Sequence, residues 1–581
     1  MSLRSAPPDG ARDIRCRLAP TPLLEALPAD LHPVLRRVLA ARQVAPAELR
    51  PGLARLVPIG DLPGVTAAAE RLARSREQGE RILVIGDFDA DGATATALTV
   101  SCLRAFGFAS PGFLVPDRFT LGYGLSRGIA ELAAAREPHL LVTVDNGITS
   151  IDGVRRAREL GMEVLITDHH LAGPRLPDAA LIVNPNLPGS TFASPALCGV
   201  GVAFYLMAAT GRCLAERGLI TAQVARDAVA DCLDLVALGT VADLVPLDFN
   251  NRILVAEGLR RIRSGRSRPG IEALFQAAGR DPALARGGDL GFAIAPRLNA
   301  AGRLTDMTLG IDCLLAADTA TALGHASQLD ELNTERRGLQ QRMQAEAEAL
   351  LADLPDFAAG AGLCLFDERW HPGIVGLVAN RMREITGQPA IAFARGTEAG
   401  MLRGSARSVE GLNIRDAIAA AVTACPGVEV RYGGHAMAAG LSLAEPDLPD
   451  FSRALAAEVS RQASVLGAGA VLWTDGGLGP ADLHLELAEA LAGGGPWGQA
   501  FPEPLFDNLF DVREQRIVGE QHLRLRVQHR DGGPVLDAIA FRHGPLASAR
   551  DVPVRLIYRL DVNHYRATRK AQLVVEHLDC V

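Results

Sequence analysis

Residues 82–92, ILVIGDFDADG, place three aspartates in a turn directly after a short apolar run. The run is too short for a helix and is typical of a strand buried on both faces of a parallel sheet. Residues 93–106 then read as a helix, so Asp87, Asp89 and Asp91 lie at the sheet edge where α/β proteins bind ligands. Three close carboxylates repel one another unless a cation holds them together. The stretch therefore predicts a parallel α/β sheet with a cation site at its edge.

Two other interpretations of this motif need to be considered. DxDxDG also begins the calcium loop of an EF-hand. That loop follows a helix and carries a glutamate at its twelfth position, whereas here a strand comes first and the twelfth residue is Leu98. The EF-hand is therefore rejected. A solvated acidic turn is the remaining alternative, because short acidic turns are common, and the rest of the chain reduces its weight.

The composition is that of a large globular protein. At 581 residues the chain predicts about three to five domains, and its 48% hydrophobic content supports real cores. The longest apolar stretch, residues 199–210, is shorter than the ~18 residues of a membrane span. The first residues hold no apolar signal core, and the nine cysteines include no CxxC pair. We therefore expect a cytoplasmic protein that contacts no membrane.

The charged residues exclude some functions and favour another. Lys570 is the only lysine in the chain, which argues against a P-loop helicase or ATPase and against lysine-dependent ligase chemistry. The net charge is −8, yet residues 513–570 contain twelve basic and six acidic residues. A basic region on an acidic chain indicates a local surface that binds a polyanion.

Further predicted strands also end in acids or histidines. The strand at 139–144 ends at Asp145, and the strand at 163–167 ends in an Asp-His-His group, with a helix at 151–160 between them. A fourth apolar element, residues 232–241, ends close to another aspartate. Strands that alternate with helices predict a doubly wound parallel sheet whose strand ends share one edge. The side chains expected to converge there are Asp87, Asp89, Asp91, Asp145, Asp168, His169, His170 and Asp243.

This set of ligands indicates the kind of metal. Oxygen ligands with one or two imidazoles suit Mn²⁺ or Mg²⁺ better than a metal that prefers thiolates. With so many carboxylates, two ions about 3.5–4 Å apart are the natural number, because one carboxylate bridges both at that spacing. The residues therefore predict two divalent ions, Mn²⁺ or Mg²⁺.

At this point the sequence resembles a known family. GDFDADG, VTVDNGI, TDHH and GTVAD resemble the four metal motifs of the DHH phosphoesterases. With APRLNAAGRL, RWHPGIVGLVANR, GSARS and GGHAMAAG in this order, they resemble the RecJ family of bacterial single-stranded-DNA exonucleases. The resemblance covers nearly the whole chain from about residue 60.

The resemblance implies roles for individual residues. Asp89 and Asp91 match the family's DxD ligands, and Asp145 matches the aspartate that bridges two ions. His169 and Asp243 match the remaining ligands. Two further expectations concern the Asp-His-His group: Asp168 orients a histidine, and His170 lies near the scissile phosphate.

One position departs from the family pattern. Many members carry a histidine four residues before the first DxD aspartate, where this chain has Ile85. The shell of one ion then lacks that ligand, and Asp87 is the candidate replacement.

The second half of the chain predicts a connector and another α/β unit. Residues 326–351 read as a long helix, with leucines and a methionine at three- and four-residue steps. Residues 363–366 begin the second unit. The expected division is an N-terminal helical segment at 1–50, a DHH domain at 51–320, a connecting helix at 321–355, a DHH-associated domain at 356–465 and an oligonucleotide-binding (OB-like) β-barrel at 466–581.

Several polar residues are candidates for binding phosphate. Glycines let backbone amides approach an anion, and a planar arginine matches a phosphate group. Each residue alone is more often structural, but the resemblance favours a functional role for Arg297, Asn299, Arg407 and His435. Trp370 reads equally well as a core residue. The full set of phosphate or DNA candidates is Arg118, Arg297, Asn299, Arg303, His371, Ser405, Arg407 and His435.

From about residue 471 the pattern changes to alternation. Residues 523–527 alternate apolar and basic or polar side chains, and residues 552–562 and 572–576 also read as strands. A short β-domain with basic outward positions is typical of an oligonucleotide-binding barrel, although a purely structural β-domain fits the same pattern. The aromatic candidates for base stacking are Phe541, Tyr558 and Tyr565.

The resemblance implies a metal-dependent exonuclease that degrades single-stranded DNA from its 5′ end and releases 5′ mononucleotides in repair and recombination. We expect a monomer whose partners are single-stranded DNA, a helicase and a single-strand-binding protein. Two alternatives remain: a DHH phosphoesterase that acts on short oligoribonucleotides or nucleoside bisphosphates, and a non-catalytic DNA-binding scaffold.

Overall fold

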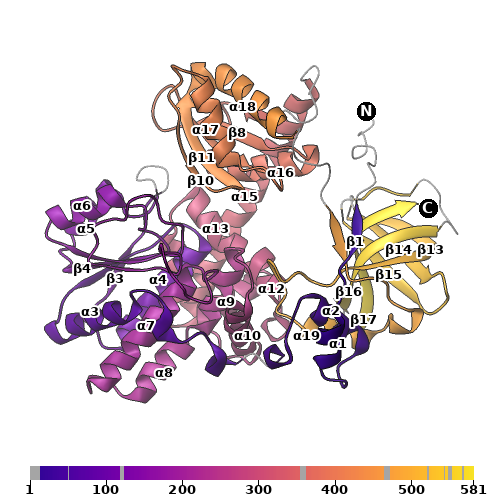
Figure 1. Ribbon diagram of the computed structural model, residues 1–581, viewed down its shortest axis with the longest axis horizontal. Helices are drawn as coiled ribbons and strands as arrows, with labels where there is room; N and C mark the ends of the chain where they lie inside the picture. Colours follow the sequence, from indigo (N-terminus) through magenta and orange to yellow (C-terminus); the bar gives the residue numbers. More distant parts are fainter. Residues whose placement is uncertain are drawn as a thin grey trace.

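The computed structural model describes residues 13–49, 52–117, 123–353, 362–463, 471–519, 522–541, 543–546, 553–565 and 568–580. Figure 1 shows two α/β lobes, with the second lobe above the first, and a β-barrel to one side. The expected Arg118 lies outside the described ranges. Among the helices in those ranges, none combines the length and apolar character needed to cross a membrane.

The first lobe is built on a sheet of five parallel strands. In spatial order these are β3 (Gly112–Leu114), β2 (Ile82–Ile85), β4 (Leu140–Val144), β5 (Glu163–Thr167) and β6 (Leu181–Val183). Helices α3 (Val65–Gln78), α4 (Ala90–Ala105) and α7 (Gly199–Glu216) cover one face, and α5 (Arg127–Ala134) and α6 (Ile151–Glu159) cover the other. Alternate strand residues therefore enter different cores, which explains the unbroken apolar runs.

A layer of helices follows the sheet and ends at the connector. Its members are α8 (Ala222–Ala230), α9 (Leu233–Ala242), α10 (Phe249–Arg263), α11 (Pro269–Ala277), α12 (Gly287–Asp289), α13 (Ala295–Leu304) and α14 (Thr308–Leu315). The connector α15 (Thr319–Asp353) has 35 residues, or about 50 Å of helix. It packs on α11, α13 and α14 near its start and on the second lobe near its end.

The second lobe contains a mixed sheet. Its spatial order is β10 (Arg431–Gly434), β11 (Ala438–Ala444), β9 (Met401–Arg407), β8 (Ala390–Arg395) and β7 (Leu363–Phe366). Only the pairing of β7 with β8 is parallel among these strands. Helix α16 (Val375–Thr386) packs with β7 and β8, whereas α17 (Ile414–Ala424) and α18 (Leu448–Ala463) pack in a separate core against β9 and β11.

The C-terminal module is a closed five-stranded barrel. Its strands are β13 (Phe506–Val518), β14 (His522–His529), β15 (Val535–Ala540), β17 (Thr568–Cys580) and β16 (Pro553–Tyr565), in spatial order. Closure leaves no free edge. A short strand β12 (Leu472–Thr474) and a helix α19 (Leu485–Gly493) come before the barrel.

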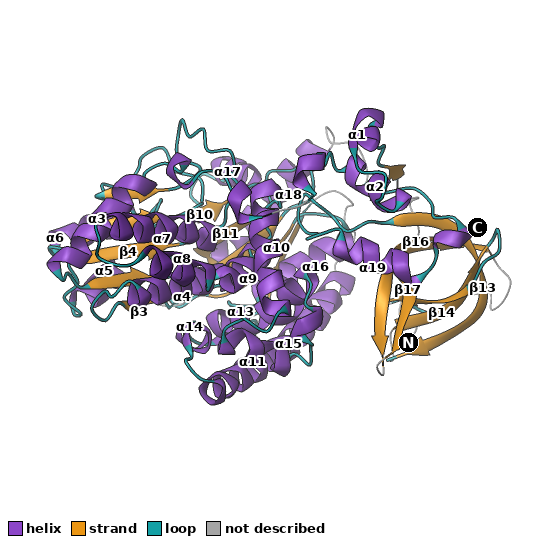
Figure 2. Cartoon of the chain, turned by 90° about the horizontal axis from the view of Figure 1, so that it is seen from below, coloured by secondary structure: helices purple, strands orange, loops and turns teal. Residues whose placement is uncertain are grey.

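The N-terminal segment packs against this C-terminal module, as Figure 2 shows at one end of the molecule. Strand β1 (Ile14–Cys16) pairs in parallel with β12, and α1 (Thr21–Ala26) and α2 (Pro33–Ala41) follow it. The buried Arg42 donates two hydrogen bonds, of 2.7 and 3.0 Å, to the carboxylate of Asp475. The two ends of the chain are therefore joined by both backbone and side-chain contacts.

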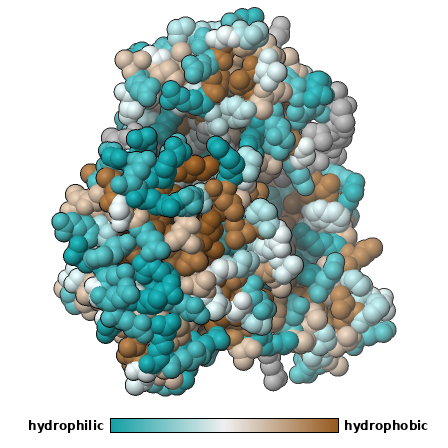
Figure 3. Space-filling view, turned by 60° about the vertical axis from the view of Figure 1, so that its left-hand side comes forward, coloured by the Kyte–Doolittle hydropathy of each residue, from teal (hydrophilic) through white to brown (hydrophobic). Residues whose placement is uncertain are grey.

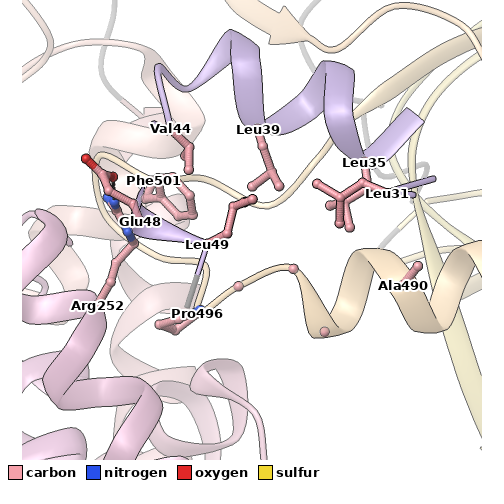
Figure 4. Close-up of a pocket in the computed structure, with 13 residues that line it drawn as sticks. Leu31, Leu35, Leu39, Val44, Glu48, Leu49, Arg252, Ala490, Pro496 and Phe501 are labelled. Atoms are coloured by element: carbon pink, nitrogen blue, oxygen red, sulfur yellow. Dashed lines mark hydrogen bonds and ion pairs between the residues drawn. The ribbon is translucent and has the colours of Figure 1, made fainter. Parts of the chain in front are cut away.

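A pocket of about 360 Å³ lies between this segment and the rest of the molecule. Figure 4 shows Leu35 and Leu39 of α2 above the turn after α19. At one end Arg252 of α10 pairs with Glu48, and its guanidinium lies 4.4 Å from the Phe501 ring centroid. The N-terminal segment thus also contacts the first lobe.

The predicted fold class is confirmed: two α/β lobes, a long connecting helix and a C-terminal barrel. Three details of the expectation were wrong. The connecting helix begins at Thr319, before the 326–351 stretch read from the apolar repeat, because the Asp318 carboxylate accepts a hydrogen bond from the Thr321 amide. The region from residue 471 forms β12 and α19 before the barrel, which begins only at Phe506. The N-terminal segment contains a strand as well as helices.

We predict that Asp475→Asn destabilises the contact between the chain ends by roughly 3–5 kcal/mol, because it leaves the buried Arg42 without its charged partner. Limited proteolysis would then release the N-terminal segment faster, and the midpoint of urea unfolding would fall. Arg15→Ala is the control, because Arg15 pairs with Asp13 at the surface. Equal protease resistance in both variants would contradict the assignment.

Candidate metal centre between the lobes

The aspartate turn after β2 is held rigidly by hydrogen bonds. Asp89 caps α4: its Oδ1 accepts from the amides of Asp91 (2.9 Å) and Gly92 (3.0 Å). From the opposite side, Asn299 of α13 accepts a hydrogen bond of 2.8 Å from the Ala90 amide. The turn is thus fixed before any ligand binds.

Asp91 is directed at the start of another helix. Its two carboxylate oxygens accept from the first amides of α7, Gly199 at 2.6 Å and Val200 at 2.9 Å. Burial and the neighbouring Asp89 raise the pKa of Asp91 to about 7, even though the α7 amides favour the charged form. The α7 N-terminus therefore partly offsets the cost of burying this acid.

Asp145 lies against the same helix start. Its backbone adopts φ 62°, a left-handed conformation uncommon outside glycine. A Cβ atom at Gly199 would lie 2.4 Å from the Asp145 Cβ, so only glycine leaves room here. Asp145 Oδ1 lies 3.2 Å from His169 Nε2, which is itself 3.6 Å from Asp243 Oδ2. Asp243 follows the last residue of α9, so the fourth apolar element is a helix that ends at the site.

The geometry fits divalent cations. Asp145 Oδ1 and His169 Nε2 are buried and make no hydrogen bond within the described ranges. Three overlapping groups each bring ligand atoms within 4.8 Å of one another. They are Asp145 with His169 and His170, Asp91 with His169 and Asp243, and Asp87 with Asp89 and Asp145.

The electrostatics lead to the same conclusion. Burial and the surrounding carboxylates raise the pKa of Asp145 and of Asp243 well above the usual value. Burial and His170 lower the pKa of His169 to about 3, so this imidazole is neutral and free to coordinate. Such a set of acids is stable in its charged form only with a cation among them.

Asp168 contacts both histidines of the Asp-His-His group. Its Oδ1 lies 2.7 Å from His170 Nδ1 and accepts from the amides of His169 and His170, while Oδ2 accepts from the Ile148 amide. Burial alone would raise the Asp168 pKa, but the hydrogen bond and charge of His170 lower it. Although burial opposes it, Asp168 also raises the pKa of His170 to about 9. Because Nδ1 faces Asp168, Nε2 is the nitrogen left for a substrate.

Ile85 supplies no ligand. It is fully buried in the core that the sheet forms with α5 and α6. Asp87 belongs instead to the group with Asp89 and Asp145. The proposed replacement of the family histidine by Asp87 therefore agrees with where the two side chains lie.

Tyr123 is a residue of the site that the sequence interpretation missed. Its hydroxyl donates to the Asp145 carbonyl oxygen (3.0 Å) and lies 3.3 Å from His170 Nδ1. Its ring meets the Phe88 and His170 rings edge-on. In the sequence, Tyr123 is marked only by its place in a loop with glycines on both sides, after β3. Such a position alone does not indicate a functional residue.

The second lobe faces this centre through His435. The rings of His435 and His170 are stacked, with centroids 6.3 Å apart and an interplanar angle of 11°. Burial, His170 and Arg415 lower the pKa of His435. The metal centre therefore lies where the two lobes meet.

Ser405 and Arg407 lie on β9 of the second lobe beside the first turn of α16. Arg407 Nη1 donates to Ser405 Oγ (3.1 Å). A Cβ at Gly376 of α16 would lie 2.9 Å from Ser405 Oγ and 3.0 Å from Arg407 Nη2. A hydroxyl, a guanidinium and the start of a helix thus form a group suited to an anion.

Other predicted phosphate ligands make contacts within the protein. Arg303 donates to the Gly373 carbonyl oxygen (3.2 Å) and so joins α13 to the second lobe, and His371 Nδ1 accepts from the Gly373 amide (3.1 Å). Trp370 is buried and donates to Glu346 of α15 (3.0 Å), so it is a core residue. These contacts hold the two lobes in their relative position.

The structure changes the roles expected for Arg297 and Asn299. Arg297 is buried, pairs with Asp330 of α15 (2.8 Å) and donates to the Ala293 carbonyl oxygen (2.6 Å). These groups hold the Arg297 guanidinium inside the helical layer, and its contact with phosphate stays a prediction. The side-chain oxygen of Asn299 accepts a hydrogen bond from the Ala90 amide and so supports the aspartate turn.

The barrel aromatics also differ from expectation. Tyr558 is fully buried and donates to Asn508 Oδ1 (2.9 Å), so it does not stack on a base. Phe541 is 60% exposed. The side chain of Tyr565 lies outside what the structure describes.

Three family models match the chain. "DHH family, N-terminal domain" matches residues 81–240, "DHHA1 domain" matches 358–461 and "RecJ OB domain" matches 474–577. The chain is 47% identical to "Single-stranded-DNA-specific exonuclease RecJ" of Salmonella typhimurium, over 95% of this chain and 96% of that protein. It is also 47% identical to the protein of that name from Escherichia coli, over 95% and 96% of the two chains. This chain belongs to the RecJ family.

Solved RecJ structures share the architecture. The crystal structure of RecJ in complex with Mn²⁺ from Thermus thermophilus superposes with a TM-score of 0.80 at 30% identity, covering 98% of this chain and 80% of that one. A crystal structure of exonuclease RecJ bound to manganese gives a TM-score of 0.58 at 34% identity, over 70% of this chain and 97% of that one. The predicted RecJ resemblance is therefore confirmed.

We predict that Gly199→Ala weakens Mn²⁺ binding roughly 10–100-fold, the usual cost of disturbing the support of a metal ligand. The new methyl group would displace the Asp145 carboxylate without removing any ligand. Isothermal titration with Mn²⁺ is the measurement. Gly338→Ala on α15 is the matched control, because no atom lies within 4 Å of its Cβ position. Wild-type affinity in a folded Gly199→Ala protein would refute this placement of Asp145.

Proposed function

We propose that this chain is a metal-dependent exonuclease that degrades single-stranded DNA from its 5′ end to 5′ mononucleotides. The observation that carries the proposal is the buried group of carboxylates and imidazole whose unsatisfied atoms, Asp145 Oδ1 and His169 Nε2, converge between two lobes. The names of its RecJ relatives support the substrate. The 5′ polarity is proposed from the resemblance of the sequence motifs.

We propose two ions, Mn²⁺ or Mg²⁺, as its cofactors. Their ligands are Asp87, Asp89, Asp91, Asp145, His169 and Asp243, which form the overlapping groups described above. Bound there, such ions lower the pKa of water and polarise a phosphoryl oxygen.

The remaining residues bind and orient the substrate. Asp168 fixes His170 so that Nε2 is free to donate to a phosphoryl oxygen, where charge grows in the transition state. Ser405, Arg407 and the first turn of α16 are placed to hold a phosphate of the strand, and His435 approaches from the same lobe. In this proposal residues of both lobes contact the same strand.

The two alternatives account for less of the structure. A phosphoesterase acting on short oligonucleotides has no use for the closed barrel that follows the two lobes. A non-catalytic scaffold has no need for buried carboxylates that are stable only with a cation. Rates on a series of substrates of increasing length test the first alternative. Removal of metal with a chelator tests the second, because a scaffold should bind DNA equally well without metal.

We predict that the protein, given Mn²⁺, releases mononucleotides from a 5′-phosphorylated single strand whose 3′ end is blocked. The protein should release no mononucleotides from duplex DNA, and EDTA should stop their release from the single strand. Asp145→Ala should lower kcat by at least about 10²–10³-fold, the scale of losing one transition-state charge contact, with little change in DNA affinity. Quantitative gel analysis of labelled strands is the measurement. Parallel losses of affinity and turnover would count against Asp145 as a catalytic metal ligand, and degradation only from the 3′ end would reverse the proposed polarity.

We predict that Phe541→Ala weakens single-stranded DNA binding by about 1–3 kcal/mol, because this exposed ring lies at the end of β15 and is available to stack on a base. Fluorescence anisotropy in EDTA measures binding without cleavage. Phe541→Trp should retain affinity, and Val535→Ala, an exposed apolar residue of the same strand, is the control. Equal affinities in all three variants would show that Phe541 is no stacking platform.

A further inference from the structure

Large apolar side chains are exposed beside the metal centre. Leu171 directly follows His170 and is 63% exposed, and Leu244 directly follows Asp243 and is 68% exposed. Tyr123, whose hydroxyl donates a hydrogen bond to the Asp145 carbonyl oxygen, is 42% exposed. Single exposed apolar residues are ordinary on a protein surface. Here, however, three of them border one buried polar site.

The two leucines follow residues of different elements that meet at the centre. His169 Nε2 is 3.6 Å from Asp243 Oδ2, and the rings of His169 and His170 lie 4.4 Å apart. Leu171 lies in the loop after β5, and Leu244 lies just after the end of α9. Figure 3 shows apolar surface in the middle of the molecule, on the first lobe below the second.

The backbone conformation of Leu244 also indicates a functional role for this residue. Leu244 has φ 59° and occupies the position directly after the α9 C-cap. Helices usually place glycine at this left-handed position, because a side chain there costs about 1–2 kcal/mol. An exposed apolar residue in this conformation is a cost to folding, and strained positions concentrate at functional sites.

The chemistry of the proposed substrate identifies what these side chains contact. A phosphodiester held at the metal centre has one nucleotide on each side, and the base faces are the nearest apolar parts of a nucleic acid. In a duplex those faces are covered by stacking, so side chains reach them only when bases are unpaired and separated. Apolar contacts at this point thus favour single strands.

We infer that Leu171 and Leu244, with the ring of Tyr123, form an apolar rim that binds the bases on either side of the scissile phosphate and so selects unpaired DNA. This inference rests on the proposed nuclease function and names the feature that gives its single-strand specificity.

The test compares variants on strands with and without a base. Leu244→Gly removes the side chain and relieves the backbone, so it should fold at least as well as wild type. Leu171→Ser is the second variant. Leu132→Ala, an exposed leucine on α5, is the control. Each is assayed with Mn²⁺ on a normal 5′-phosphorylated strand and on strands with an abasic analogue at the first or second nucleotide.

We expect each rim variant to lower kcat/KM about tenfold on the normal strand and less than about twofold on the abasic strand that lacks its base partner. The Mn²⁺ concentration for half-maximal rate should stay unchanged, as should all rates of the control. Equal losses on normal and abasic strands, or a raised Mn²⁺ requirement, would overturn the inference while the nuclease function stands. A wild-type protein that releases no nucleotide would instead overturn the proposed function, and the inference with it.

Discussion

Mutual repulsion among buried carboxylates is the constraint on which the first lobe depends. Asp91 and Asp145 are fully buried, and burial together with neighbouring carboxylates raises the pKa of both. The fold reduces this cost with oriented amides: the start of α7 binds Asp91, and Asp89 caps α4. What remains is negative potential that a divalent cation neutralises. The sheet edge is therefore a site whose stability in the charged form and whose function both depend on metal.

Much of this centre could be predicted from the sequence, because parallel strands end at a common edge. From that rule alone, Asp145 and the Asp-His-His group are predicted to lie beside the aspartate turn. It gave no information about Tyr123, which reaches the site through a hydrogen bond to the Asp145 carbonyl oxygen. Nor did it predict the ion pair of Arg297 with Asp330, which depends on the packing of α13 against α15. Contacts made between distant elements leave no local pattern.

The same distinction holds for the fold. Apolar runs located β2 to β5 of the first lobe and β7 of the second, and a helical apolar repeat located the connecting helix, whereas β6 and β8 to β11 were not predicted. The structure of residues 472–505 was missed, because its short strand pairs with β1 of the N-terminal segment and its short helix packs on β16 and β17, contacts between segments distant in the chain. In the second lobe, the link from Arg303 to Gly373 and the buried Trp370 show that α13 and α15 set the distance between His435 and His170.

The pairing of the two chain ends has a consequence for biosynthesis. Arg42 and Asp475 are 433 residues apart, so at about 5–20 residues per second Arg42 leaves the ribosome roughly 20 to 90 seconds before its partner is made. During that interval the apolar side of α2, with Val34, Leu35, Val38 and Leu39, has no C-terminal module to pack against. The metal-binding lobe is complete much earlier. The nascent chain therefore passes through a stage in which the metal-binding lobe has been synthesised while α2 of the N-terminal segment still exposes its hydrophobic side.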